Sequence, residues 1–267
     1  MQHAARSFLF VPANRVERFD KALTAGSDAV IIDLEDAVPT HLKLEARQQL
    51  ADWLTTYPET EVMIRVNSKQ TEWFSDDITL AKYPNVTAIV LPKTESIADL
   101  QAIFEIQDID IYPLIETPLG FSQVREIAKA RHVKALMFGS IDFQLEMEMN
   151  GGYQELVYFR NEIVLASKLA NIDAPIDGVT VDIHNHEVLM LETTQAKNLG
   201  FAGKLCIHPL QINTVNQVFM PNQNEIDWAQ RVLDMVAKAN GQAVSLDGKM
   251  IDLPIIRRAQ KILQQLD

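Results

Sequence analysis

Short runs of apolar and β-branched residues alternate along this chain with segments that have the spacing of amphipathic helices. Several of the runs are almost continuously apolar, which is typical of strands buried on both faces of a parallel sheet. The eight runs span residues 7–12, 29–36, 62–67, 88–93, 111–116, 135–142, 174–179 and 204–209. Eight alternating strand–helix units predict an α/β fold, the (β/α)8 TIM barrel, which commonly fills a chain of 267 residues as one domain.

The segments between the runs have helical character over residues 42–57, 96–106, 118–131 and 153–171. An open doubly wound sheet is the alternative fold. However, no run is followed by the Gly-x-Gly-x-x-Gly with which such sheets bind dinucleotides, so the barrel is favoured.

The chain continues well beyond the eighth run. The pattern predicts a helix over residues 222–240, a turn at Asp247-Gly248 and a second helix over 254–266. We therefore expect a TIM-barrel catalytic domain over residues 1–220 and a C-terminal helical extension over 221–267. The extension is expected to serve as a lid or as an arm packed on a neighbouring subunit.

Charge and composition exclude several classes of partner. The formal net charge of -12 disfavours nucleic acid, because a polyanion is repelled and no basic patch interrupts the sequence. No stretch approaches the roughly 18 apolar residues that a membrane helix needs. The single cysteine, Cys206, cannot form an intramolecular disulfide and lies in an apolar run, which predicts a buried structural thiol and a cytoplasmic protein.

Ionisable side chains recur where the runs end. The active site of a parallel barrel is built at the C-terminal ends of its strands, so these residues are the first candidates for function. Arg65 and Glu116 lie within or directly after apolar runs, where an unpaired charge would be costly, and the alternative for each residue is a salt bridge that closes the barrel. The residues at these ends are Asp33, Glu35, Asp36, Arg65, Asn67, Lys93, Glu116, Asp142 and His208.

Glu116 and Asp142 are the candidate metal ligands, because they end neighbouring strands and carry hard oxygen donors. Mg²⁺ typically uses one or two carboxylates together with water and substrate oxygens. Zinc fits less well, since His184 and His186 have a chelating spacing but no third nitrogen or sulfur ligand nearby. We expect those two histidines to lie in an ordinary surface loop.

Arg65 is a candidate binder of a carboxylate or an enolate oxygen, which a bound 2-oxo acid would present. The repulsion within Asp33, Glu35 and Asp36 would be relieved by a metal ion or an arginine. Glu35 and Asp36 are therefore expected to orient the water ligands of the metal. Capping of a helix is an equal alternative for Asp36.

Eight short segments stand in order along almost the whole chain: 6–12 (RSFLFVP), 33–38 (DLEDAV), 64–67 (IRVN), 91–93 (LPK), 114–120 (LIETPLG), 139–142 (GSID), 207–209 (IHP) and 248–252 (GKMID). Taken together, these segments resemble the citrate lyase beta subunit-like branch of the HpcH/HpaI aldolase family, and the ordered set is far more specific than any single motif. The resemblance implies a (β/α)8 lyase that binds Mg²⁺ and cleaves 3-hydroxy-3-carboxyalkyl acyl thioesters, such as citryl, malyl or citramalyl thioesters.

The resemblance implies a role for individual residues. Glu116 and Asp142 become the metal ligands, Arg65 binds the 2-oxo acid, and Asp252 is the acid/base group. Asp252 lies in the C-terminal extension, which in coenzyme A-dependent relatives reaches the active site of an adjacent subunit in a trimer. A homo-oligomer, either a trimer or a hexamer, is therefore expected.

The thioester-binding channel is assigned to Lys93 and to the first-strand residues Arg6 and Phe8, although Phe8 is equally suited to fill the barrel interior. Relatives often carry an acidic or small residue immediately before the metal-binding aspartate. This chain has Ile141 there, which leaves the ligand intact but changes its surroundings.

Three functions follow as hypotheses. The first is a Mg²⁺-dependent lyase that acts on a coenzyme A thioester. The second is a citrate lyase beta subunit that acts within a complex on a thioester bound to an acyl carrier protein. The third is a metal-dependent aldolase on free hydroxy-oxo acids; such enzymes generally use a histidine base, and the segment around Asp252 argues against this third hypothesis.

Overall fold

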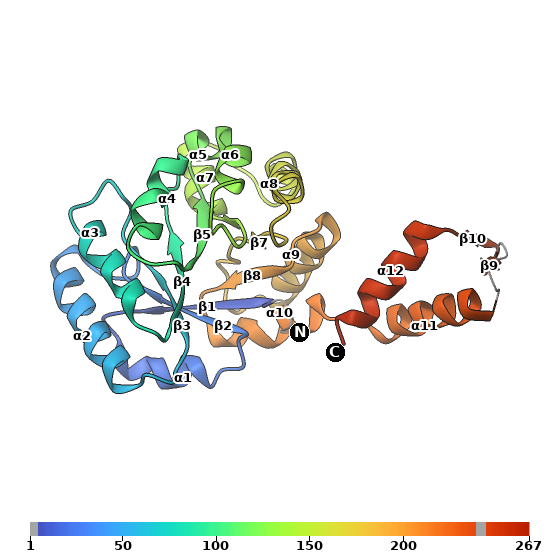
Figure 1. The fold of residues 1–267 in the computed structure, drawn as a ribbon, viewed down its shortest axis with the longest axis horizontal. Helices are drawn as coiled ribbons and strands as arrows, with labels where there is room; N and C mark the ends of the chain where they lie inside the picture. The colour runs from blue at the N-terminus through green and yellow to red at the C-terminus, as the bar shows by residue number, and fades with distance from the viewer. Residues whose placement is uncertain (1–4, 239–243, 267) are drawn as a thin grey trace. The chain divides into compact units, whose positions relative to one another are not determined.

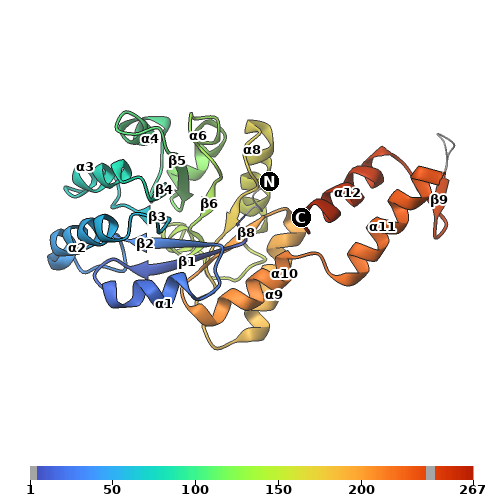
Figure 2. The same ribbon diagram turned by 60° about the horizontal axis from the view of Figure 1, so that its bottom comes forward.

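A computed structural model describes residues 5–238 and 244–266 of the chain. The first compact unit, residues 5–216, is a closed barrel of eight strands in the order β1 to β8, and its helices lie outside the ring of strands (Figure 1, Figure 2). The TIM-barrel prediction is therefore confirmed. The strands are β1 (Ser7–Pro12), β2 (Ala29–Asp33), β3 (Val62–Arg65), β4 (Val86–Leu91), β5 (Asp110–Ile115), β6 (Met137–Phe138), β7 (Ile176–Asp177) and β8 (Gly203–Cys206).

Parallel pairing brings all eight strand ends to one rim. Asp33 pairs with Arg65 between β2 and β3, Arg65 pairs with Val90 on β4, and the ring closes where Ser7 on β1 pairs with Lys204 on β8. The strands β6 and β7 are much shorter than the predicted runs 135–142 and 174–179. At β6 this is because the chain turns into a helix at Ser140, directly after Gly139.

The helices of the barrel match the predicted segments only in part. The segment 118–131 forms two short helices and not one, because Gln123 (φ -103°, ψ 4°) separates them. Helices α1, α3, α7, α9 and α10 lie outside the four helical ranges that were named from the sequence. The helices are α1 (Phe19–Leu23), α2 (Lys43–Thr56), α3 (Phe74–Asp77), α4 (Ile97–Phe104), α5 (Pro118–Ser122), α6 (Val124–Ala128), α7 (Ser140–Glu146), α8 (Val157–Ala170), α9 (His186–Leu199) and α10 (Ile212–Phe219), with the 3-10 turns η1 (Val16–Arg18), η2 (Thr40–Leu42), η3 (Ile78–Lys82) and η4 (Pro209–Gln211).

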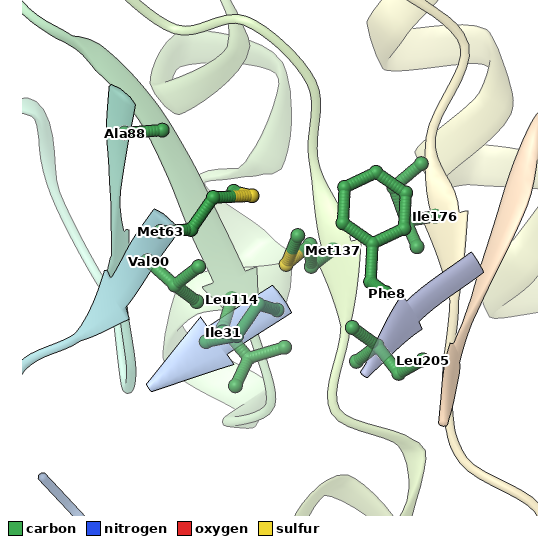
Figure 3. Packing of buried hydrophobic residues seen from close by; sticks show 9 residues of the cluster. All are labelled: Phe8, Ile31, Met63, Ala88, Val90, Leu114, Met137, Ile176 and Leu205. Carbon is green, nitrogen blue, oxygen red and sulfur yellow. The ribbon is translucent and has the colours of Figure 1, made fainter. Parts of the chain in front are cut away.

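The barrel interior is filled by apolar side chains that point inward from the strands (Figure 3). Each of the eight strands contributes at least one member, so the interior is a packed core and not a channel. The buried members are Phe8, Ile31, Met63, Ala88, Val90, Leu114, Met137, Ile176 and Leu205. Inside the ring of strands, this core leaves polar side chains only the two ends of the barrel.

The second unit begins at residue 217 and contains two helices and a β-hairpin. Its elements are α11 (Gln223–Lys238), β9 (Val244–Leu246), β10 (Lys249–Ile251) and α12 (Leu253–Gln264). The predicted turn is present, because Asp247 (φ 51°) and Gly248 (φ 77°) both have the left-handed backbone that a two-residue hairpin turn requires. Residues 239 and 240 of the predicted first helix lie outside the described residues.

Within this unit, Ala229, Val232, Ile251 and Ala259 form a small buried core between the helices and the hairpin. No helix in the described part of the chain has the length and apolar character needed to cross a bilayer.

Candidate active site

The rim at the C-terminal ends of β2 to β5 gathers the predicted ionisable residues. Arg65 Nη1 lies 3.2 Å from Glu35 Oε2 and 3.7 Å from Asp36 Oδ2, and Lys93 Nζ lies 3.8 Å from Glu35 Oε1. The backbone N–H of Lys93 donates a 2.8 Å hydrogen bond to Glu116 Oε1. Residues from four different strand ends thus form one cluster, as the parallel pairing requires.

Arg65 is held in place by Asp33. Its Nε and Nη2 donate to the two carboxylate oxygens of Asp33 at 2.7 and 2.6 Å, and its guanidinium lies 4.7 Å from the centre of the Phe10 ring. Asp33 also accepts the backbone N–H groups of Glu35 and Ala37. Burial by itself would lower the pKa of Arg65, but the charge and hydrogen bonds of Asp33, together with the charges of Glu35 and Asp36, outweigh burial and raise the pKa, so the residue is a permanent cation. Its Nη1 remains directed toward Glu35.

Glu116 is only 2% exposed. Burial, with a further contribution from the charge of Glu35, raises the pKa of Glu116 to about 8, although the hydrogen bond from Lys93 and the charge of Arg65 act against the rise. Gly139 packs directly on this side chain, since a Cβ at that position would lie 2.5 Å from both Cβ and Oε2 of Glu116. Glycine is required there because a side chain has no room. Its backbone conformation does not require glycine, since a φ of -85° is open to any residue.

Glu35 lies beside Glu116 in the same cluster. Burial raises the pKa of Glu35 to about 7, against the lowering effect of Arg65. Its Oε2 atom is buried and accepts no hydrogen bond, despite its proximity to Arg65 Nη1. The buried Lys43 Nζ donates to the main-chain oxygens of Leu34 and Glu35, both at 2.9 Å, and so fixes the loop that carries Glu35. Sequence reasoning missed Lys43, because it stands at the start of a helix with no local signal of this contact.

Lys93 has a left-handed backbone (φ 47°), an uncommon conformation for a residue with a side chain. This conformation accompanies the hydrogen bond from its N–H to Glu116, while its side chain stays 45% exposed. Strained backbone of this kind collects at functional sites, where the surrounding structure holds it in place.

Asp142 is placed differently from the prediction. It does not end a strand but lies in the first turn of α7, half-buried, three residues after Gly139. It is nevertheless part of the cluster, since its negative charge contributes to the raised pKa values of Glu116 and Lys93. Asp36 caps neither helix that follows it, because the N-caps are Pro39 and Leu42.

The structure does not bring Arg6 and Phe8 to this cluster. Arg6 precedes β1 and therefore lies at the opposite end of the barrel, where it forms a two-pronged ion pair with Asp28. Phe8 is buried among the apolar residues of the barrel interior (Figure 3). The packed interior lies between Arg6 and the cluster, and the assignment of both residues to substrate binding stays a prediction.

Asp252 belongs to the C-terminal unit. Its carboxylate accepts a 3.1 Å hydrogen bond from the N–H of Ile255 and caps α12, and the residue is exposed. Its predicted role as acid/base group stays a prediction.

Three other sequence interpretations can be placed. The loop prediction holds for His184, but His186 begins α9, and its Nδ1 lies 2.9 Å from Thr214 Oγ1. Cys206 is buried as expected, and burial raises the pKa of its thiol to about 12, so the side chain is a poor nucleophile. His208 caps η4 by accepting the N–H of Leu210.

The cluster has an excess of negative charge. Five carboxylates, those of Asp33, Glu35, Asp36, Glu116 and Asp142, lie with three cations, Arg65, Lys93 and the buried Lys43. Among the described residues, no group of three or more histidine, cysteine, aspartate or glutamate side chains is arranged as a metal cage. Two carboxylates and a buried oxygen without a donor suit a hard divalent cation that keeps several water ligands.

The fold and this rim define the class of the protein: a (β/α)8-barrel enzyme whose acidic cluster, with a fixed arginine, suits metal-assisted chemistry on an anionic substrate. Two family models match the chain. That of the HpcH/HpaI aldolase/citrate lyase family covers residues 6–209, and that of the C–C bond lyases of the TIM-barrel fold covers residues 157–266.

Individual relatives agree with the family models. Citrate lyase subunit beta of Haemophilus influenzae is 34% identical over 97% of this chain and 96% of its own length. The (3S)-malyl-CoA thioesterase of Cereibacter sphaeroides is 31% identical over 99% and 95%. The crystal structure of CitE from Mycobacterium tuberculosis in complex with magnesium, acetoacetate and coenzyme A superposes with a TM-score of 0.86, at 33% identity and 98% coverage of both chains.

The chain belongs to the HpcH/HpaI aldolase/citrate lyase family, and it is an enzyme of this carbon–carbon lyase class.

Proposed function

We propose that this protein is a cytoplasmic, Mg²⁺-dependent lyase that cleaves a 3-hydroxy acyl thioester of the citramalyl, malyl or citryl type to an acyl thioester and a 2-oxo acid. The observation that carries the proposal is the buried carboxylate cluster around Glu116, whose excess negative charge calls for a divalent cation. The M. tuberculosis relative that binds magnesium, acetoacetate and coenzyme A supports the same class of ligands.

Glu116 and Asp142 are the residues that would hold the cation. When bound, a magnesium ion supplies Lewis-acid stabilisation of the negative charge on the substrate oxygens. Glu35 and Asp36, on the loop after β2, would orient the water ligands. The raised pKa of Glu116 means that the cation must displace a proton at neutral pH.

Arg65 would bind the 2-oxo acid through Nη1, the nitrogen that the ion pair with Asp33 leaves directed toward Glu35. Because Asp33 holds the other two nitrogens, the guanidinium is oriented before substrate arrives and needs no reorganisation. The exposed ammonium of Lys93 would offset charge on the substrate from the side of β4.

Asp252 would act as the base. As a carboxylate it accepts the proton of the substrate hydroxyl, whose carbon becomes the carbonyl of the 2-oxo acid. The electrons of the broken carbon–carbon bond pass to the thioester as an enolate, which takes up a proton on carbon and leaves as the acyl thioester. We further propose that the protein is a homo-oligomer, a trimer or a hexamer, in which the C-terminal unit acts as a lid or arm on a neighbouring subunit.

The test is an assay of the purified full-length chain with malyl-, citramalyl- and citryl-CoA in the presence of Mg²⁺, following release of the 2-oxo acid. We expect turnover of at least one thioester, and a loss on the order of 10²–10³ in rate for Glu116→Gln. Glu126→Gln, which changes an exposed glutamate on α6 paired with Lys129, is the matched control and should keep the full rate. Turnover of none of the three thioesters, or equal rates in the Glu116 variant, would contradict the proposal.

A second candidate is the beta subunit of a citrate lyase complex acting on a carrier-bound thioester, because a relative with that name aligns over nearly its whole length. The same assay with a phosphopantetheine thioester on an acyl carrier protein separates the two candidates. A rate at least tenfold higher on the carrier than on coenzyme A would favour the complex.

A further inference from the structure

A second cluster of buried charges lies between the barrel and its helices, outside the rim site. Asp177 on β7 and Lys204 on β8 are at most 1% exposed, and Arg160 on α8 is 4% exposed. Arg160 Nε donates to Asp177 Oδ1 at 2.8 Å, and Lys204 Nζ lies 3.3 Å from Asp177 Oδ2. Glu192 on α9 completes the cluster at 3.9 Å from Lys204 Nζ.

Stability alone does not explain this cluster. Removing charges from water is costly, and well-packed apolar residues of similar volume often serve stability equally well. Its other contacts are therefore informative. The shortest contact of Lys204 Nζ is a 2.6 Å hydrogen bond to the main-chain oxygen of Gly178, the residue that follows β7.

Gly178 in turn packs on the start of α7. A Cβ at position 178 would lie 2.4 Å from Ser140 Oγ and 2.8 Å from the main-chain oxygen of Phe138. The same segment also touches the proposed metal site, because Gly139 packs with equally little clearance on Glu116. The segment 138–140 thus contacts both Glu116 and Gly178.

Asp142 follows that segment within one turn of helix. Any movement of Gly178 away from Ser140 would let the start of α7 move, and with it the position of Asp142 relative to Glu116. Arg160 also contacts the end of β6, since its guanidinium lies 5.4 Å from the ring of Phe138. The same guanidinium lies 3.9 Å from the ring of Tyr153.

We propose that Lys204 is a positioning residue, which sets the spacing between Glu116 and Asp142 by holding the Gly178 carbonyl against the start of α7. It contacts neither substrate nor metal. This inference rests on the proposed function, because it takes Glu116 and Asp142 as the ligands of a divalent cation.

The choice of metal ion supplies a readout that general destabilisation would not change. Mg²⁺ demands a near-ideal octahedral site at short distances, whereas Ca²⁺ accepts a flexible and wider one. If Lys204 sets the spacing of the two carboxylates, its loss should weaken Mg²⁺ binding much more than Ca²⁺ binding.

The experiment measures the dissociation constants of Mg²⁺ and of Ca²⁺ by isothermal titration calorimetry on the full-length chain, comparing wild type with Lys204→Met. Methionine keeps the volume and leaves Asp177 paired with Arg160. We expect about a tenfold weakening for Mg²⁺, the low end of what losing a direct hydrogen-bond partner of a metal ligand costs, and less than about threefold for Ca²⁺. Arg125→Met, which removes the exposed ion pair between α6 and α8, is the control and should leave both constants unchanged.

Gly178→Ala tests the same contact while the buried charged side chains stay intact. This variant tests the inference if Lys204→Met does not fold. It should lower the ratio of Mg²⁺ to Ca²⁺ affinity in the same direction. Unchanged ratios in a folded variant would overturn the inference while leaving the proposed function standing. Failure of the wild-type protein to bind either ion would overturn both the inference and the proposed function. Loss of binding in Glu116→Gln distinguishes binding at the proposed site from adventitious binding elsewhere.

Discussion

At the scale of single residues, the site depends on side chains whose chemistry is changed by what surrounds them. Glu116 and Glu35 are buried beside each other with too few cations, so both hold protons more tightly than an exposed carboxylate would. Arg65 is oriented by Asp33, and Lys93 adopts a backbone conformation that glycine would adopt more easily. Each of these properties can be tested by a conservative substitution.

The first prediction concerns the pH dependence of stability without metal. The folded-state pKa of Glu116, about 8, lies above its unfolded value, so its contribution to the free energy of unfolding is fully present below about pH 4.5 and is lost as the pH rises to about 8. Relative to Glu116→Gln, wild type should lose on the order of 2–4 kcal/mol between pH 5 and pH 8. Urea denaturation in EDTA measures both proteins, and parallel pH profiles would contradict the assignment.

The second prediction uses the strained backbone of Lys93. Lys93→Gly relieves the left-handed conformation and Lys93→Ala does not, so the glycine variant should be more stable by about 1 kcal/mol. Both variants lose the ammonium group and should lose catalytic activity to the same extent. Thermal denaturation and the thioester assay together separate the two effects, and equal stabilities would show that the backbone is not strained.

At the scale of elements, the turn between β6 and α7 decides the geometry of the site. The sequence pattern places one strand over 135–142, but the strand ends at Phe138 because Gly139 lets the chain pass against Glu116 and start a helix. A pattern of apolar residues does not distinguish these two possibilities, since both a buried strand and a buried first helical turn are apolar. The positions of the eight strands were predictable, because the apolar runs are short, contain β-branched residues and alternate with longer segments of helical spacing.

The third prediction follows from that turn. In Gly139→Ala the new methyl group meets Glu116, so we expect Mg²⁺ affinity to fall at least about tenfold and stability to fall by about 1–3 kcal/mol. Gly26→Ala is an informative control, because position 26 has open space but a φ of +84°, and should cost stability without changing metal affinity. Calorimetric titration with Mg²⁺ and urea denaturation provide the two measurements. Normal metal affinity in Gly139→Ala would contradict the close packing.

At the scale of the whole molecule, the chain consists of a barrel that carries the carboxylate site and a C-terminal unit that carries Asp252. The two units have separate cores, and Asp252 caps a helix within its own unit. A proposal in which one subunit supplies Asp252 to the barrel of another therefore makes a prediction about mixtures.

The fourth prediction is that two inactive variants complement each other. Subunits of Glu116→Gln and Asp252→Asn, mixed in equal amounts and allowed to exchange, should recover up to about a quarter of the wild-type rate, because that fraction of sites in a cyclic oligomer combines an intact Glu116 with an intact Asp252. The thioester assay before and after exchange measures the recovery. An exchanged mixture that stays inactive would place both residues in the same subunit or deny Asp252 its role.

The sequence by itself determined the alternation of strands and helices, the burial of Glu116 at a strand end, the turn at Asp247-Gly248 and the family. The first three are local properties, since each depends on residue types within a short stretch of chain, and the family follows from the order of eight such stretches. The tertiary structure alone decided which charges meet. Arg65 and Asp33 are 32 residues apart, Lys93 and Glu116 are 23 apart, and Lys204 and Gly178 are 26 apart. The raised pKa values, the places of Arg6 and Phe8 away from the cluster, and the role proposed for Lys204 all arise from burial and from contacts between distant segments, which no local pattern encodes.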